Sequence, residues 1–101
     1  MNNGMSLRTL YMKLELEKKH VKVSLFILNE LIRICEKNIE KKRLGSSTME
    51  LRLIKDIYNM IINEIKDQDL RTFFARCINE LDEKLEYLRK EIFERKNENR
   101  G

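Results

Sequence analysis

Apolar residues recur at alternating spacings of four and three along the first forty residues, which is the period of one α-helical face. This first stripe comprises Leu7, Tyr11, Leu14, Val21, Leu25, Leu28, Ile32, Cys35 and Ile39. A second stripe, on a neighbouring face, comprises Leu16, Val23, Ile27, Leu31 and Ile34. A helix with two apolar stripes is stabilised by packing on two sides. We therefore expect an all-α chain whose first helix has neighbours on both faces.

The chain has few residues that interrupt a helix. It contains no proline, and Gly45 is its only glycine outside the termini, which disfavours a β architecture. Ser6 is a suitable N-cap for a first helix over residues 6–43. Gly45 is suited to the left-handed conformation that often follows the last residue of a helix.

A capping signal follows Gly45. Ser47 and Glu50 have the spacing of a capping box, in which each side chain accepts a hydrogen bond from the other residue's amide. We therefore predict a turn at 44–47 and a second helix over 48–66.

The apolar phase of the second helix does not continue through the rest of the chain. A new stripe comprises Leu70, Phe74, Cys77, Ile78, Leu81, Leu85, Leu88 and Ile92. A straight helix cannot turn both stripes towards one partner. We predict a turn or a kink at 66–69 and a third helix over 70–96 with coiled-coil-like packing. Residues 1–5 and 97–101 are expected to fray.

The length and composition fit one small helical domain covering 1–101. Charged residues make up 38% of the chain, a content typical of long amphipathic helices. No apolar run approaches a membrane span, so we expect no membrane association. Cys35 and Cys77 lie on apolar stripes, which favours reduced core thiols and a cytoplasmic location.

The predicted helix lengths do not match. At about 1.5 Å per residue the first helix is ~57 Å long and the second ~28 Å, so residues 7–21 would have no partner within the chain. We expect a second subunit to cover them. If the second and third helices form a kinked hairpin instead, the second stripe is left for a partner. The third alternative is a compact monomeric three-helix bundle.

These patterns predict a non-enzymatic association module, either a homodimer or a small accessory subunit that binds a larger protein. The predicted interface comprises Leu7, Tyr11, Leu14, Leu16, Val21, Val23, Ile27 and Ile34.

The sequence offers little chemistry. His20 is the only histidine, and Glu17-x-x-His20 resembles the Glu-x-x-His half-motif of ferritin-like di-iron bundles. That resemblance covers four residues, and the third helix offers no histidine. No glycine-rich loop or nucleophile–histidine arrangement is evident. We therefore expect no catalytic site, metal, cofactor or small-molecule substrate.

Nucleic-acid binding is the alternative function. The net charge is +4, and residues 1–46 carry ten Lys and Arg against five Glu. One face of the first helix could contact phosphates through its cations and stack its aromatic ring on a base. This face comprises Arg8, Lys19, Lys22, Phe26, Arg33, Lys37 and Lys41.

Overall fold

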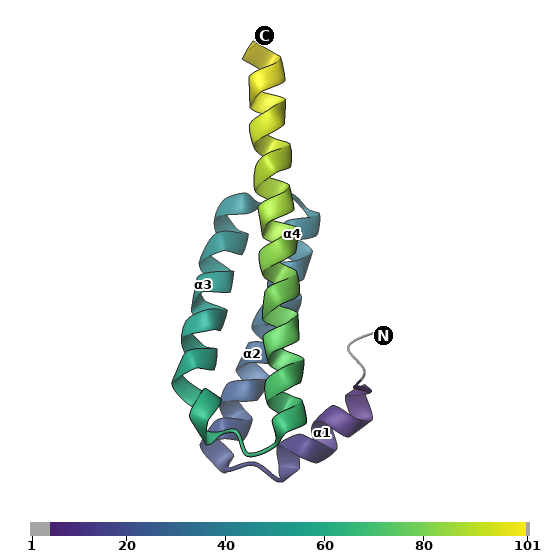
Figure 1. Ribbon diagram of the computed structural model, residues 1–101, viewed down its shortest axis with the longest axis vertical. Helices are drawn as coiled ribbons and strands as arrows, with labels where there is room; N and C mark the ends of the chain where they lie inside the picture. Colours follow the sequence, from purple (N-terminus) through teal and green to yellow (C-terminus); the bar gives the residue numbers. More distant parts are fainter. Residues whose placement is uncertain (1–4, 101) are drawn as a thin grey trace.

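A computed structural model describes residues 5–100, with side chains to residue 95. Its elements are α1 (Leu7–Glu15), α2 (Lys19–Glu40), α3 (Leu44–Ile61), the 3₁₀ turn η1 (Ile62–Glu64) and α4 (Gln68–Arg100). Helices α2, α3 and α4 lie side by side as a bundle, and α1 lies at the end of the bundle where α4 begins (Figure 1). The described residues contain no strand, which confirms the all-α prediction.

One hydrophobic core joins the helices. It comprises Leu10, Leu14, Val21, Leu25, Leu28, Ile32, Cys35, Leu51, Ile54, Tyr58, Ile61, Ile65, Leu70, Phe74, Cys77, Ile78, Leu81, Leu85 and Leu88. Each bundle helix therefore buries one apolar stripe, as amphipathic helices do when they pack. None of the described helices is long and apolar enough to cross a membrane.

The prediction of one continuous helix over 6–43 is wrong. Ser6 caps α1 as expected, accepting a hydrogen bond from the Thr9 amide at 3.1 Å, but α1 ends at Glu15. The chain then turns without glycine or proline, and α2 starts at Lys19. At about 1.5 Å per residue, α2 is only ~33 Å long. The break thus removes the length mismatch inferred from the sequence.

A buried carboxylate holds this break in place. Glu17 is only 7% exposed, and its two carboxylate oxygens accept hydrogen bonds from the backbone amides of Lys66 and Asp67, each at 3.0 Å. The α1–α2 connection is thereby attached to the loop before α4. We call this arrangement the Glu17 clasp.

The turn after α2 also differs from the prediction. Lys42, not Gly45, adopts the left-handed conformation, with φ of 63°. The Arg43 amide donates to the Asn38 carbonyl at 2.8 Å, the six-residue closure of a Schellman motif. The Lys42 ammonium is held by the Glu91 carboxylate at 2.7 Å. This contact with α4 ties the left-handed residue to the rest of the bundle.

The predicted capping box at Ser47 does not form. Helix α3 begins at Leu44, so the expected turn at 44–47 is its first turn. Ser47 is buried and its hydroxyl donates to the Arg43 carbonyl at 2.7 Å. Glu50 instead accepts a hydrogen bond from the Asn38 amide group at 2.7 Å. Both side chains therefore serve packing between α2 and α3.

The chain reverses at residues 65–67, between η1 and α4. Asp67 accepts a hydrogen bond from the Leu70 amide at 3.1 Å, so it caps the start of α4. Helix α4 continues to Arg100, four residues past the predicted end at 96, and extends beyond the α2–α3 connection (Figure 1). The fraying expected at residues 1–4 and 101 lies outside the described residues.

Candidate interaction surfaces

A row of exposed aliphatic side chains runs along α2 and α3. We call it the apolar face; its exposed members are Val23, Ile27 and Ile34 on α2 and Leu53 and Met60 on α3. Leu31 and Ile57 lie between them and are partly buried against the core. Val23, Ile27 and Ile34 each remain nearly half exposed. Most of the second stripe of the predicted first helix is therefore not covered by this chain.

Polar contacts between helices show that these residues lie on one side of the bundle. On the flank of α2 that carries the second stripe, Asn38 binds Glu50, and His20 approaches Glu64 at 2.6 Å. Glu50 belongs to α3 and Glu64 to η1, so this flank of α2 faces those two elements.

The opposite flanks of α2 and α3 contact α4. Glu36 of α2 contacts Lys84 at 3.8 Å, and Lys55 of α3 binds Asp82 at 2.8 Å. The apolar rows of α2 and α3 therefore adjoin each other on the side of the bundle away from α4.

Charged residues of both signs border the apolar face. Exposed Glu30 and Arg33 lie along the outer edge of α2 and form an ion pair at 3.1 Å. Exposed Arg52 and Asp56 lie one turn apart on α3. Between the contacts Asn38–Glu50 and His20–Glu64, Glu30 lies close to the level of Asp56, and Arg33 lies between the levels of Arg52 and Asp56.

The expectation that residues 7–21 lack an intrachain partner is wrong for part of the set. Leu14 and Val21 are buried in the core, because the break after Glu15 folds α1 back onto the bundle. Leu7 and Leu16 remain well exposed, and Tyr11 partly so. Leu14 and Val21 are therefore unsuitable as surface residues, whereas Val23, Ile27 and Ile34 lie on the apolar face.

The predicted basic face lies on the outer side of α1 and α2. Lys22 binds Glu15 at 3.3 Å and Arg33 binds Glu30. Arg8, Lys19, Lys37 and Lys41 are exposed and form no ion pair within the described part of the chain.

Phe26 does not stand alone among these cations. Tyr11 of α1 lies against it, with ring centroids 5.6 Å apart and ring planes inclined by 36°. Both rings are exposed, Tyr11 by 43% and Phe26 by 41%. The apolar spacing of the sequence predicts Tyr11 in the interface, and only the fold-back of α1 reveals its contact with Phe26.

Glu17 and His20 do not converge on a shared site. Glu17 binds the two backbone amides of its clasp, while His20 faces Glu64. Among the described residues, no group of three His, Cys, Asp or Glu side chains is placed to hold a metal ion.

The two thiols belong to the core. Cys35 and Cys77 are both buried, and neither forms a disulfide. Burial, with a smaller contribution from nearby carboxylates, raises the pKa of each thiol to about 11. A thiol with that pKa is almost wholly protonated at neutral pH and is a poor nucleophile.

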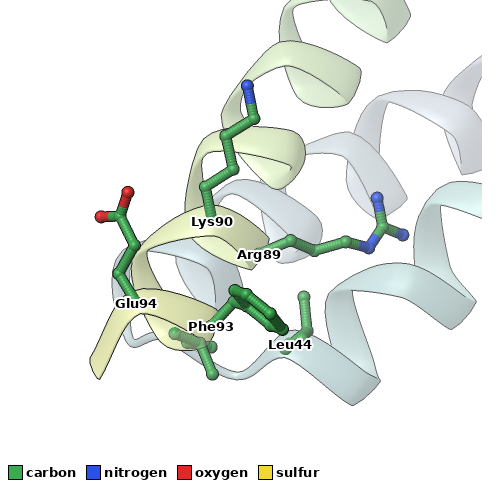
Figure 2. A pocket seen from close by; sticks show the side chains of 6 residues that line it. Leu44, Arg89, Lys90, Phe93 and Glu94 are labelled. Carbon is green, nitrogen blue, oxygen red and sulfur yellow. The ribbon is translucent and has the colours of Figure 1, made fainter. Parts of the chain in front are cut away.

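A shallow pocket lies where α4 passes the start of α3. Phe93 of α4 lies beside Leu44 at the floor, and the charged chains of Arg89, Lys90 and Glu94 surround it (Figure 2). The pocket has a volume of about 430 Å³. It contains no histidine, thiol or hydroxyl group, so its lining offers packing and charge and no nucleophile.

Comparisons with family models, curated proteins and solved structures yield no match to this chain.

Proposed function

We propose that the chain is a non-enzymatic helical association module and that a second copy covers its apolar face. The single observation that carries the proposal is the apolar face on α2 and α3, in which five exposed aliphatic side chains flank two partly buried ones. Isolated exposed apolar residues are ordinary, but a contiguous row spanning two helices is typical of an interaction surface.

The energy available from this face is sufficient for a dimer. Full burial of an aliphatic side chain contributes about 1.5–3 kcal/mol. Five side chains that are about half exposed or more, with two that are partly buried, therefore contribute roughly 5–10 kcal/mol per copy. Two copies together supply about 10–20 kcal/mol before the association cost of roughly 4–15 kcal/mol. The difference is compatible with a micromolar Kd, which corresponds to about 8 kcal/mol.

The shape of the apolar face is compatible with a second copy as the partner. A two-fold axis parallel to the helices places α2 of one copy against α3 of the other. Ile27, Leu31 and Ile34 have the four-and-three spacing of a coiled coil, so we propose coiled-coil-like packing between the copies.

The test compares two exposed apolar residues by light scattering after size exclusion over a dilution series. Ile27→Asp places a charge in the middle of the apolar face and is expected to weaken dimerisation at least 100-fold. Met12→Asp places the same charge on an exposed residue of α1 and should leave dimerisation unchanged.

Two results would count against this proposal. A monomer at about 100 µM chain would exclude the second copy and leave a different protein as the occupant. A dimer that survives Ile27→Asp, Leu53→Asp and their combination would place the interface elsewhere.

The two buried cysteines, neither of which forms a disulfide, also support a reducing compartment. The proposal accordingly places the protein in the cytoplasm.

A further inference from the structure

We propose that the Tyr11–Phe26 pair and the cations around it bind single-stranded nucleic acid, with an unpaired base stacked on the two rings. We call this surface the aromatic–basic ridge; it comprises Tyr11, Phe26, Arg8, Lys19, Lys22, Arg33 and Lys37. It adjoins the apolar face at Arg33, which lies on the α2 edge of that face, but its two rings take no part in the proposed dimer contact.

The rings are available for stacking. Each exposes about two fifths of its surface although α1 and α2 both contribute to the core. Tyr11 and Phe26 support each other at 5.6 Å, so each is held in place by a neighbour on one side and open to solvent on another. Exposed aromatic rings of this kind accept bases of any sequence, because every base has a π face.

The cations extend along the helix from the ring pair. Lys22 precedes Phe26 by one turn, and Lys37 follows it by three turns, so the two lysines are ~22 Å apart along the axis. This distance matches a few nucleotides of a single strand. Arg8 precedes Tyr11 by one turn of α1 and adds a further exposed cation.

The existing ion pairs do not block this surface. Lys22–Glu15 and Arg33–Glu30 are exposed pairs at 3.3 and 3.1 Å, and such pairs contribute little stability. Phosphates can therefore replace the carboxylates as partners of these cations. Lys19 and Lys37, which are in no ion pair within the described ranges, are available directly.

Unpaired bases distinguish this ligand from a duplex. A double helix offers phosphates to the cations but keeps its base faces stacked inside, where Tyr11 and Phe26 cannot reach them. With three or four phosphates engaged, the slope of log affinity against log salt should be about −2 to −3.

The experiment measures fluorescence anisotropy of labelled oligo(dT) and oligo(U) of fifteen nucleotides at 20–200 mM salt, with a duplex of equal length for comparison. Phe26→Leu and Tyr11→Leu keep apolar bulk and remove the ring. Each is expected to weaken single-strand binding about tenfold or more, consistent with the energy of stacking one base. Tyr87→Leu is the matched control, because Tyr87 is an exposed tyrosine on α4, and it should bind normally.

Lys37→Glu is expected to weaken binding and to reduce the salt slope by about one. The relative affinities of oligo(dT) and oligo(U) identify DNA or RNA as the preferred strand. Several results would overturn the proposal: no binding at 20 mM salt, equal or tighter binding to the duplex, or unchanged affinity in the doubly substituted Tyr11→Leu, Phe26→Leu chain. Circular dichroism of each variant shows that the fold is retained.

Discussion

The Glu17 clasp gives the sharpest prediction about how this chain folds. Glu17→Ala removes the acceptor of two backbone hydrogen bonds, from Lys66 and Asp67. An amide left without a partner costs about 1–3 kcal/mol when it is buried. Since water can reach the exposed side of Lys66, we expect a total loss of about 2–4 kcal/mol in the free energy of unfolding.

Two further variants distinguish the loss of the clasp hydrogen bonds from the loss of a negative charge, as measured by the free energy of unfolding. Glu17→Gln retains one neutral acceptor oxygen, and we expect a loss of about 1–2 kcal/mol. Glu86→Ala removes a carboxylate from an exposed ion pair with Arg89 on α4, away from the apolar face, and its effect should stay within about 0.5 kcal/mol.

The assay is urea unfolding followed by far-UV circular dichroism at one fixed chain concentration, because dimerisation makes stability depend on concentration. The loss expected for Glu17→Ala corresponds to a fall in Tm of about 10–25 °C for a domain of this size. Hydrogen exchange at the amides of Lys66 and Asp67 should accelerate in the same variant. If Glu17→Ala is as stable as Glu86→Ala and both amides remain protected, the clasp does not hold the α1–α2 break.

Two other predictions follow from the turn residues. Because Lys42 has a φ of 63°, Lys42→Gly should be more stable than Lys42→Ala by about 1 kcal/mol in urea unfolding. Both variants lose the ion pair to Glu91, so the comparison isolates the backbone conformation. Equal stabilities would show that the left-handed conformation carries no cost. Partial burial raises the pKa of Asp67, but hydrogen bonds from Lys13 and the Leu70 amide outweigh it and hold the pKa below its usual value. The stability that Asp67 contributes is therefore present above the unfolded pKa of about 3.9 and is lost as the pH falls through the lower folded pKa. The Tm of Asp67→Asn should accordingly fall less between pH 5 and pH 2 than the Tm of the natural chain. Parallel plots of Tm against pH for the two proteins would contradict this.

Local signals in the sequence were sufficient for the helical class and for much of the core. The four-and-three spacing from Leu25 to Cys35 is the buried stripe of α2, and the stripe from Leu70 to Leu88 is that of α4. Ser6 caps its helix through a partner three residues away. Each of these features depends on neighbours within a turn or two, which is the range that periodicity and capping rules describe.

The break after α1 could not be read from the same signals. Its stabilising partner is the backbone of residues 66 and 67, about fifty residues from Glu17, and the apolar spacing continues across it. Lys42 likewise takes the left-handed position despite its side chain, held by Glu91 on α4. Both misjudgements arise because tertiary contacts overrode the local preference of the chain.

The two candidate surfaces also combine features that the sequence shows with features that depend on tertiary contacts. The α2 part of the apolar face lies on the second stripe, which the sequence shows, whereas the contribution of Leu53 and Met60 depends on how α3 is turned. The Tyr11–Phe26 contact depends on the fold-back of α1 and has no signal in the spacing of the two residues.

The mass of the unmodified chain in solution, measured by sedimentation equilibrium at about 10–100 µM, tests the proposed association most directly. The account predicts twice the chain mass of 12.3 kDa, with dissociation on dilution towards the micromolar range. A single species of 12.3 kDa over the whole concentration range would contradict it.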